Sequence, residues 1–377
     1  MLLFKSKKKM AQQLDLVISK DNGYSSYNRS KHKYLFNVCD ELSKIYNNKK
    51  VFVVPSGMAS INTIFNILNI KNGWLPQNIV YGNELYCDTP RTIKYMNNCY
   101  TKNLLFEVDI SNDQEVLNTF NTKIDKKLPT ILFIESCSNP SGYIFYFDLI
   151  KDLRANNEKL TIIVDNTWVS GYVFNPFNFD IDYTVVSLTK YYSAGNCIAG
   201  AIIGKQDDPI MDEIRNFICV YGLHVSPYNC KIVFDNIKTI QKRINASYNL
   251  TLNVAQFLSD NNINVRFVGL PNHKSNNHLI KFFNNKGPSV LTFTVNMSKK
   301  DTISWLKKEQ YFPFETSFGS GHSKFDPWPQ KETNKKTRIR FSIGYNDNYE
   351  NIVQKLSQML NINKSSAFQM NKKTLEI

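Results

Sequence analysis

The chain has 377 residues, of which 42% are apolar and 21% charged, so it is long enough for two or three domains and too apolar to be intrinsically disordered. Its 13 Pro and 15 Gly exclude a collagen-like or linker composition, and no apolar run approaches the roughly 20 residues that cross a bilayer. The formal net charge of +14 suggests a polyanionic partner, but most lysines are scattered along the chain. We therefore expect a solvated basic surface, with neither a membrane nor nucleic acid as partner.

The seven cysteines show no C-x-x-C spacing, and their odd number in a long chain argues against a disulfide scaffold. The opening sequence Met1-Leu2-Leu3-Phe4 is too short for a secretory signal and precedes the basic residues instead of following them. We expect a reducing, cytoplasmic compartment and no metal site.

The first 49 residues are polar and mixed, and we assign them to an N-terminal arm. Within this arm Leu35, Val38, Leu42 and Ile45 recur at three- and four-residue spacing, which predicts a helix over residues 32–45.

From residue 50 the chain alternates short apolar runs with segments of helix or loop length. This alternation predicts an α/β fold with a mostly parallel central sheet that is covered on both faces. Such sheets bind their ligands at the carboxyl ends of the strands. We expect a large domain over residues 50–240, with strands at residues 51–54, 79–81, 104–108, 130–134, 161–164, 183–186 and 198–203.

After about residue 221 the pattern changes. The spacing predicts one long helix over residues 229–258, connecting two lobes, and alternating strands over residues 289–295 and 338–343. We therefore expect a smaller C-terminal α+β domain over residues 241–377.

A lysine follows one of the predicted buried strands, in the sequence Ser187-Leu188-Thr189-Lys190-Tyr191. A lysine beside two hydroxyls in an apolar stretch is poorly explained as a solvated charge, although a surface lysine on a loop is the plain alternative. Burial lowers the pKa of a lysine and leaves an amine that can attack a carbonyl. The hydroxyls of Ser187 and Thr189 would suit an anion such as phosphate.

Two further segments place polar groups at strand ends. The apolar run 162–164 ends in Asp165, whose carboxylate would pair with a positive nitrogen of a ligand or cap the next segment. Residues 53–60 predict a strand, a tight Ser56-Gly57 turn and a helix start, where backbone N–H groups bind phosphate. A phosphate cradle, a carboxylate for a pyridine nitrogen and an amine for a carbonyl are together what pyridoxal 5'-phosphate (PLP) requires.

At these motifs the chain resembles the Cys/Met-metabolism PLP-dependent enzymes, a family that includes cystathionine γ-synthase, the cystathionine lyases and methionine γ-lyase. The resemblance covers roughly residues 24–345 and implies the type I, aspartate-aminotransferase-like PLP-dependent transferase fold with a seven-stranded sheet. It rests on five segments in this order: Ser56-Gly57-Met58, Glu135-Ser136-Cys137-Ser138-Asn139-Pro140-Ser141-Gly142, Asp165-Asn166-Thr167, Ser187-Leu188-Thr189-Lys190-Tyr191 and Arg338-Ile339-Arg340-Phe341-Ser342-Ile343-Gly344.

The resemblance implies a role for each cofactor residue. Lys190 matches the lysine that forms the internal aldimine and then moves protons, and Asp165 matches the carboxylate paired with the pyridine nitrogen. The phosphate ligands of the family match Ser187, Thr189 and the amides of Gly57 and Met58.

The resemblance also implies residues around the ring and the substrate. Tyr86 resembles the tyrosine that stacks on the ring and assists as an acid or base, and Asn139 matches the asparagine beside the ring oxygen and the substrate carboxylate. Arg340 matches the arginine that binds this carboxylate, where its bidentate geometry fits, with Ser317 assisting. Ordinary structural roles are the alternative, such as a turn residue before Pro140 for Asn139.

Tyr27 and Arg29 resemble the Tyr-x-Arg pair that reaches the phosphate of a neighbouring subunit. This implies a homotetramer built as a dimer of dimers, in which residues 1–49 make inter-subunit contacts. The Asn-Pro-Thr that usually follows the pair is replaced by Ser30-Lys31-His32-Lys33, which weakens this expectation.

Segments on the substrate side depart from the family pattern. Tyr86 is followed by Cys87-Asp88-Thr89 in place of Gly-Gly-Thr or Gly-Cys-Thr, which puts a carboxylate near the substrate side chain. The usual Gly-His-Ser-Asp after the lysine becomes Gly195-Asn196-Cys197-Ile198, and Ser317-Phe318-Gly319-Ser320-Gly321-His322 replaces the usual Ser-Leu-Gly-Gly segment. Retained cofactor residues with changed substrate residues favour a PLP enzyme and leave its substrate open.

We expect a PLP-dependent enzyme that acts at Cβ or Cγ of an amino acid, with γ-replacement of the cystathionine γ-synthase kind as the first hypothesis. The alternative is a β- or γ-elimination lyase of sulfur amino acids, like the cystathionine lyases or methionine γ-lyase. A third hypothesis is a non-catalytic homologue that binds a polyanion, although such a binder has no need of both Lys190 and Asp165.

Overall fold

The structure is a computed structural model that describes residues 31–309, 312–328 and 335–362. Contacts between Cα atoms divide the chain into two compact units. The first unit contains the described residues up to Cys137 together with residues 145–240, and the second contains residues 138–144 and the described residues from Gln241 onward. The domain boundaries expected from the sequence stay a prediction.

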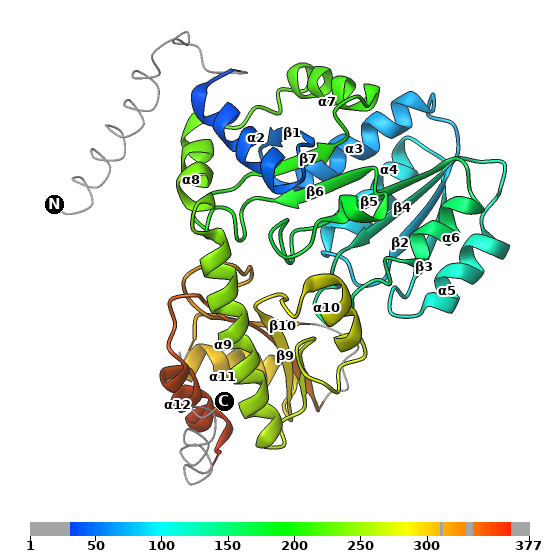
Figure 1. Cartoon of the computed structure of the whole chain (residues 1–377). Coiled ribbons are helices and arrows are strands. Elements are labelled where there is room, and N and C mark those ends of the chain that lie inside the picture. Colours follow the sequence, from blue (N-terminus) through cyan, green and yellow to red (C-terminus); the bar gives the residue numbers. More distant parts are fainter. Residues whose placement is uncertain (1–30, 310–311, 329–334, 363–377) are drawn as a thin grey trace. The chain divides into compact units, whose positions relative to one another are not determined.

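The centre of the first unit is a seven-stranded sheet made of β1 (Lys50–Val54), β2 (Asn78–Gly82), β3 (Leu104–Val108), β4 (Thr130–Glu135), β5 (Leu160–Asp165), β6 (Tyr183–Ser187) and β7 (Gly200–Gly204). The strands lie in the order β1-β7-β6-β5-β4-β2-β3 (Figure 1). Strands β2 to β6 pair in parallel, whereas β7 is antiparallel to both of its neighbours, β1 and β6. The predicted α/β fold with a mostly parallel seven-stranded sheet is therefore confirmed.

One face of this sheet is covered by α3 (Gly57–Lys71), α4 (Asp88–Cys99) and α7 (Pro209–Val220), which share a single apolar cluster with the strands (Figure 1). Successive side chains of a strand point to opposite faces. Ile131 and Phe133 of β4 lie in this cluster, and Leu132 and Ile134 between them are buried on the opposite face. Burial on both faces explains why the strands are continuous apolar runs.

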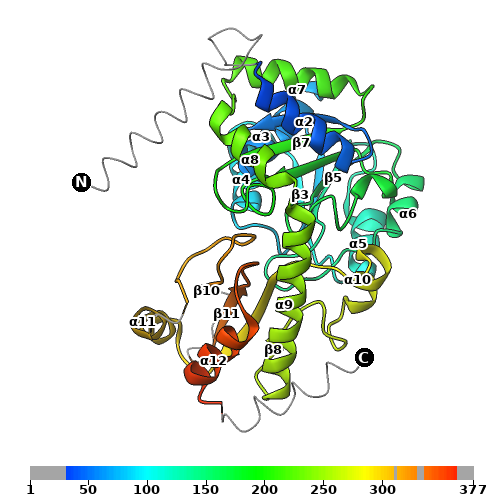
Figure 2. The same ribbon diagram turned by 60° about the vertical axis from the view of Figure 1, so that its left-hand side comes forward.

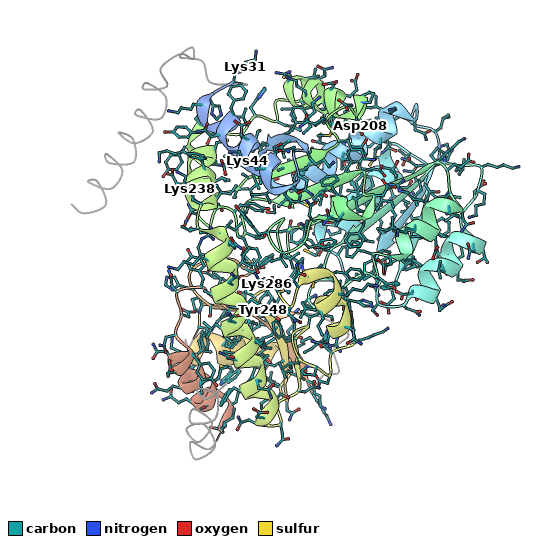
Figure 3. The ribbon with its side chains drawn as sticks, viewed as in Figure 1. Lys31, Lys44, Asp208, Lys238, Tyr248 and Lys286 are labelled. Atoms are coloured by element: carbon teal, nitrogen blue, oxygen red, sulfur yellow. The ribbon has the colours of Figure 1, made fainter. Side chains whose placement is uncertain are left out.

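Local sequence determines where the helices begin. Ser56 caps α3 by accepting the N–H of Ala59 on its hydroxyl, at 3.0 Å. Helix α7 starts with Pro209 directly after Asp208, which Figure 3 labels. The carboxylate of Asp208 accepts the N–H of Ile210 and also the hydroxyl of Tyr183. The remaining short elements of this unit are α5 (Asp113–Asn118), η1 (Thr119–Lys123), α6 (Leu149–Ala155) and η2 (Pro176–Phe179).

Two helical predictions have different outcomes. Helix α2 (Lys33–Ile45) confirms the helix expected over residues 32–45, and it packs on β1 and on α8 (Pro227–Ile237). The single long helix expected over residues 229–258 is wrong, because α8 ends at Ile237 and α9 (Ile240–Asp260) starts anew. At the break the N–H of Thr239 donates to the carbonyl of Asn236, three residues back, so the last turn of α8 tightens and stops.

The second unit is built on a four-stranded antiparallel sheet in the order β10-β11-β9-β8. Figure 2 shows its helices α9, α11 (Lys299–Glu309) and α12 (Tyr349–Leu360) around this sheet. The core is aromatic, with ring centroids of Phe325 and Phe341 4.5 Å apart and those of Phe312 and Phe325 4.7 Å apart. The strands are β8 (Val265–Arg266), β9 (Val290–Val295), β10 (Lys324–Trp328) and β11 (Thr337–Ser342), and the unit also contains α10 (Asn276–Phe283).

The sequence predicted the two inner strands of this sheet, β9 and β11, but neither outer strand. Strand β8 has only two residues, and β10 contains Pro327 and charged residues, which are compatible with an edge strand but give no apolar run. Among the described residues, no helix combines the length and apolarity that spanning a membrane requires.

Candidate active site

Three polar residues end three neighbouring strands of the first unit: Glu135 ends β4, Asp165 ends β5 and Ser187 ends β6. Two positions earlier, each strand has an apolar residue in the cluster under α3, so by alternation the three polar side chains point to that same face; these apolar residues are Phe133, Ile163 and Val185. Glu135 and Asp165 are direct partners in the β4–β5 register. The carboxyl edge of the sheet therefore brings two carboxyl groups and a hydroxyl together, as expected for a ligand site.

The first turn of α3 lies directly against the end of β6. A Cβ atom built on Gly57 would be 2.8 Å from Cβ of Ser187, and one built on Gly200 of β7 would be 2.2 Å from the carbonyl oxygen of Ser56. Only glycine permits these two approaches. In the first turn of a helix the backbone N–H groups have no intrahelical acceptor. The amides of Gly57 and Met58 thus lie close to the hydroxyl of Ser187, in an arrangement that suits an anion, and their binding of phosphate stays a prediction.

Asp165 is buried, with 7% of its surface exposed. Burial raises the pKa of Asp165 to about 6, while hydrogen bonds from Thr167 and the positive charge of Lys190 lower it. The N–H of Thr167 donates to the carboxylate at 2.9 Å, and the hydroxyl of Thr167 accepts the N–H of Ser187 at 2.8 Å. At neutral pH the site therefore holds a buried anion that a cationic ring nitrogen would neutralise.

Lys190 lies in a turn that follows β6 immediately. Its N–H points to the carbonyl of Ser187 at 3.5 Å, and its carbonyl accepts the N–H of Gly195 at 3.2 Å. The hydroxyl of Thr189 donates to the carbonyl of Ala199 and accepts the N–H of the same residue, at 3.3 and 3.2 Å. Thr189 thus holds the turn that carries Lys190, and its predicted contact with phosphate stays a prediction.

Tyr86 follows β2, the other neighbour of β4, and its N–H donates to Oε1 of Glu135. Its side chain is 41% exposed. Partial burial raises the pKa of the Tyr86 phenol, and the neighbouring Cys87 and Asp88 raise it further. The phenol therefore carries its proton at neutral pH. Asp88 itself forms an ion pair with Arg91 at 2.7 Å.

The second unit contains Arg340, in the middle of β11 and 3% exposed. Its guanidinium donates to the carbonyl of Ser317 at 3.2 Å and lies 5.5 Å from the ring centroid of Phe318. Ser317 has a φ of 88°, in a region that L-residues rarely adopt, so its backbone is strained. The carbonyl of Ser317 thereby orients Arg340, and binding of a substrate carboxylate by Arg340 stays a prediction.

Asn139 also belongs to the second unit, within residues 138–144. It is buried, and its Oδ1 has no hydrogen-bond partner among the described residues. Its segment is held in place because Ser275 Oγ accepts the N–H of Ile144 at 3.1 Å and Ser141 Oγ accepts a guanidinium N–H of Arg266 at 2.8 Å. A buried amide with an unsatisfied oxygen fits a position beside a ligand.

The structure thus places the predicted residues in two groups. The first unit brings together the cradle of Gly57, Met58 and Ser187, the turn of Thr189 and Lys190, the carboxylate of Asp165, and Tyr86. The second unit contains Asn139, Ser317 and Arg340. Tyr27 and Arg29 lie outside the described residues.

Two residues with a place in the site had no assigned role in the sequence analysis. Glu135 ends an apolar strand in a carboxyl group, as Asp165 does, so the same pattern could have found it. Thr167 connects Asp165 to Ser187 through its N–H and its hydroxyl, a bridge that depends on the neighbouring strand and leaves no pattern in the sequence.

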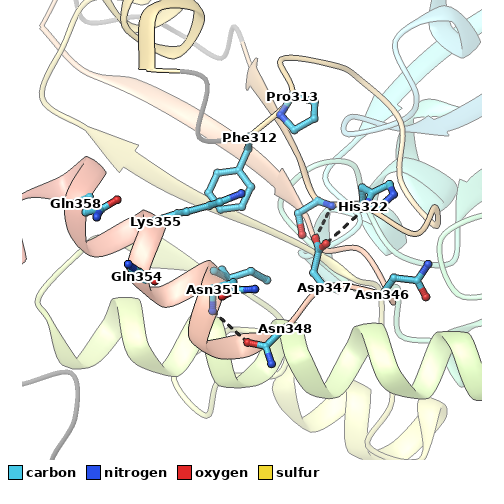
Figure 4. Close-up of a pocket in the computed structure, with 12 residues that line it drawn as sticks. Phe312, Pro313, His322, Asn346, Asp347, Asn348, Asn351, Gln354, Lys355 and Gln358 are labelled. Carbon is cyan, nitrogen blue, oxygen red and sulfur yellow. Dashed lines mark hydrogen bonds and ion pairs between the residues drawn. The ribbon is translucent and has the colours of Figure 1, made fainter.

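A polar cavity of about 520 Å³ lies elsewhere in the second unit, between α12 and residues 312–323 (Figure 4). In its wall Nδ1 of His322 lies 3.7 Å from Oδ1 of Asp347, and the N–H of Ser323 donates to Asp347 at 2.6 Å. Lys355 on α12 lies over the ring of Phe312 at 5.1 Å. The residues that line this cavity include none of the predicted site residues, so we do not assign it to the candidate site.

The residues of the first unit fit PLP. Because Gly57 has no Cβ, the first turn of α3 can lie close to Ser187. The amides of Gly57 and Met58 and the hydroxyl of Ser187 are donors that suit a phosphate. Asp165 supplies the buried carboxylate for the ring nitrogen, and Lys190 supplies an amine whose charge reaches Asp165. No group of three or more His, Cys, Asp or Glu residues that could hold a metal occurs in the described part of the chain.

Comparison with known proteins agrees with this chemistry. The family model described as "Cys/Met metabolism PLP-dependent enzyme" matches residues 4–361. A cystathionine beta-lyase from Schizosaccharomyces pombe is 26% identical over 284 residues, which are 75% of this chain and 70% of the relative. A cystathionine gamma-lyase from Saccharomyces cerevisiae is 24% identical over 306 residues, 79% of this chain and 74% of the relative.

Solved structures share the fold. The crystal structure of metB from Corynebacterium glutamicum matches with a TM-score of 0.78 at 21% identity, covering 90% of this chain and 88% of that one. A cystathionine gamma synthase from Xanthomonas oryzae pv. oryzae, in complex with aminoacrylate and cysteine, matches with a TM-score of 0.77 at 18% identity, covering 90% and 89%.

The cradle can be tested with Gly57→Ala. The new Cβ would collide with Ser187, so we expect the free energy of unfolding to fall by about 1–3 kcal/mol and the affinity for PLP to fall with it. Urea unfolding and PLP titration measure the two effects. Adding Ser187→Gly removes the Cβ with which the new methyl group collides and should restore part of the stability. It should not restore the affinity for PLP, because the hydroxyl of Ser187 is lost too. Unchanged PLP affinity in Gly57→Ala would contradict the cradle.

Asp165→Asn tests the buried charge in the protein freed of cofactor. Because the pKa of Asp165 is higher in the folded chain than its ordinary value of 3.8, ionisation costs folding free energy as pH rises from about 4 to above 6. We expect the variant to be more stable than wild type by about 3 kcal/mol at pH 8 and nearly equal to it at about pH 4. Urea unfolding at both pH values checks this, with the exposed Asp207→Asn as control. A variant less stable than wild type at pH 8 would refute it.

Proposed function

Because the chain belongs to the Cys/Met-metabolism PLP-dependent enzymes, we propose that it replaces or eliminates a substituent at Cβ or Cγ of an amino acid, with Lys190 as the proton-transfer group. The observation that carries this proposal is the meeting of the Gly57–Ser187 cradle, Asp165 and the Lys190 turn at one edge of the sheet. When bound, PLP supplies an aldehyde that links to amines and a ring that accepts electrons from carbon.

The residues of the first unit have distinct tasks in this proposal. The amine of Lys190 would remove the proton from Cα of the substrate and deliver protons to later positions. Asp165, ionised above about pH 6, would keep a proton on the ring nitrogen. The phenol of Tyr86, which is protonated at neutral pH, would donate a proton to a leaving group.

The residues of the second unit would orient the substrate. The Arg340 guanidinium is already held by the Ser317 carbonyl and the Phe318 ring, so little of its freedom is lost when a carboxylate binds. Asn139 would lie beside the same carboxylate, where its unpartnered Oδ1 would accept a hydrogen bond from the bound ligand. Both residues hold the substrate and leave proton transfer to Lys190.

Two outcomes of this chemistry have separate support. The sequence favours γ-replacement, in which a second nucleophile takes the place of the leaving group. The named relatives of 24 and 26% identity are a cystathionine gamma-lyase and a cystathionine beta-lyase, which favours elimination of a sulfur amino acid to a keto acid and ammonia. A cytoplasmic homotetramer in which Tyr27 and Arg29 complete a neighbour's site also belongs to the proposal.

Trapping with borohydride tests the role of Lys190. In the wild-type chain loaded with PLP, we expect reduction to attach the cofactor to the peptide that contains Lys190, as read by mass spectrometry. Lys190→Ala should lose this label and about 10²- to 10⁴-fold of the activity. Lys205→Ala, which changes a lysine on the loop after β7, should keep both. A label on a different lysine, or no label in wild type, would contradict the proposal.

A substrate panel separates the outcomes. Cystathionine converted to pyruvate, homocysteine and ammonia indicates β-elimination, whereas 2-oxobutyrate, cysteine and ammonia indicate γ-elimination. An acyl-homoserine and cysteine converted to cystathionine indicate γ-replacement. We expect one of these reactions to dominate, measured by product chromatography. If PLP is bound to Lys190 and none of them occurs, the proposed reaction class is wrong.

A further inference from the structure

We propose that Glu135 acts as a neutral carboxylic acid that positions Tyr86 through its backbone and leaves Asp165 as the anion at this edge of the sheet. Glu135 would be a positioning residue, because its contact is with the main chain of Tyr86. The roles of Tyr86 and Asp165 toward PLP rest on the proposed function, whereas the protonation of Glu135 is a property of the chain itself.

The geometry of Glu135 is that of a buried anchor. The residue is 1% exposed, and its Oε1 accepts the N–H of Tyr86. Its Oε2 is also buried and has no hydrogen-bond partner among the described residues. An ionised carboxylate needs several donors when it is removed from water, but here the Tyr86 N–H and the Trp168 side chain are the donors near Glu135, and Oε2 has no partner among the described residues. This geometry favours the neutral acid.

The charges around Glu135 point the same way. Asp165 faces Glu135 from β5 as its register partner, and Glu84 faces it from the segment after β2. The Cys137 thiol lies two residues after Glu135 in the sequence. Burial raises the pKa of Glu135 well above its ordinary value and the charge of Asp165 raises it further, while the Tyr86 N–H and the Trp168 side chain lower it.

Asp165 is the better place for the negative charge. It accepts hydrogen bonds from Thr167, and the positive charge of Lys190 lowers its pKa, whereas burial and the charge of Asp165 raise the pKa of Glu135. Two carboxyl groups in adjacent positions do not both ionise readily. The proton therefore resides on Glu135 and the charge on Asp165.

This arrangement has a consequence for Tyr86. Its side chain is 41% exposed, so packing alone does not fix the ring. The bond from Glu135 fixes the main chain from which the ring projects. A neutral Glu135 accepts this bond without adding a second negative charge beside Asp165. The carboxylate of Asp165 is the one that the ring nitrogen of PLP would face.

The first test uses the full chain without cofactor, so its result is independent of the proposed function. At pH 8 the infrared spectrum should contain the C=O stretch of a protonated carboxyl group. Glu135→Gln should abolish this band, and the control Glu107→Gln, at an exposed site on β3, should retain it. Absence of the band in wild type, or its persistence in Glu135→Gln, would overturn the proposal.

The second test uses the PLP-loaded chain and its visible absorption. Glutamine is neutral and keeps an oxygen for the Tyr86 N–H, so Glu135→Gln should keep the midpoint of the spectral pH titration and the PLP affinity of wild type. Glu135→Ala leaves this N–H without an acceptor and should weaken PLP binding about tenfold.

Two results of the second test would contradict the proposal. A midpoint shifted by about one pH unit in Glu135→Gln would mean that a negative charge had been removed beside Asp165. Wild-type PLP affinity in Glu135→Ala would mean that the bond does not position Tyr86. Failure of every variant and of wild type to bind PLP would refute the proposed function, and the infrared result would still decide the protonation of Glu135.

Discussion

The contact between Gly57 and Ser187 determines how the first turn of α3 meets the carboxyl edge of the sheet. Since neither Gly57 nor Gly200 has a side chain, the turn at Ser56 can lie across the ends of β6 and β7 at distances that a Cβ would forbid. The free N–H groups of the helix then face the hydroxyl of Ser187. Asp165 and Glu135 are placed relative to this point by the register of the parallel strands, so the whole first-unit site depends on one backbone approach.

The same edge buries two carboxyl groups next to each other, which opposes folding. Asp165 recovers part of this cost through Thr167 and Lys190. In the neutral form that we propose, Glu135 adds no second charge at this edge. Unfavourable burial of neighbouring ionisable groups is typical of functional sites, because a bound group supplies the missing partners.

Differences from the family pattern lie in segments whose backbone is free to vary. Asp165 and Ser187, which we propose as cofactor-binding residues, end strands whose hydrogen-bonded ladder leaves little freedom. Two of the changed segments lie outside the strands: Asp88 begins α4, and the segment from Ser317 to His322 precedes β10. Loops accept substitution more easily than strand ends do, so one scaffold can retain a cofactor while its substrate changes.

Sequence alone determined the sheet class and the seven strands of the first unit, and it proposed Lys190, Asp165 and Gly57 as site residues, because apolar runs and the polar residues that follow them are local patterns. Only the tertiary structure decided that α8 and α9 are separate, that short β8 and Pro-containing β10 are edge strands, and that residues 138–144 join the second unit. It alone showed that Thr167 bridges two strands and that Glu135 accepts the N–H of Tyr86. These features depend on contacts between segments far apart in the chain. The hydrogen bonding and burial of each residue there depend on neighbours in space, which a local sequence pattern does not predict.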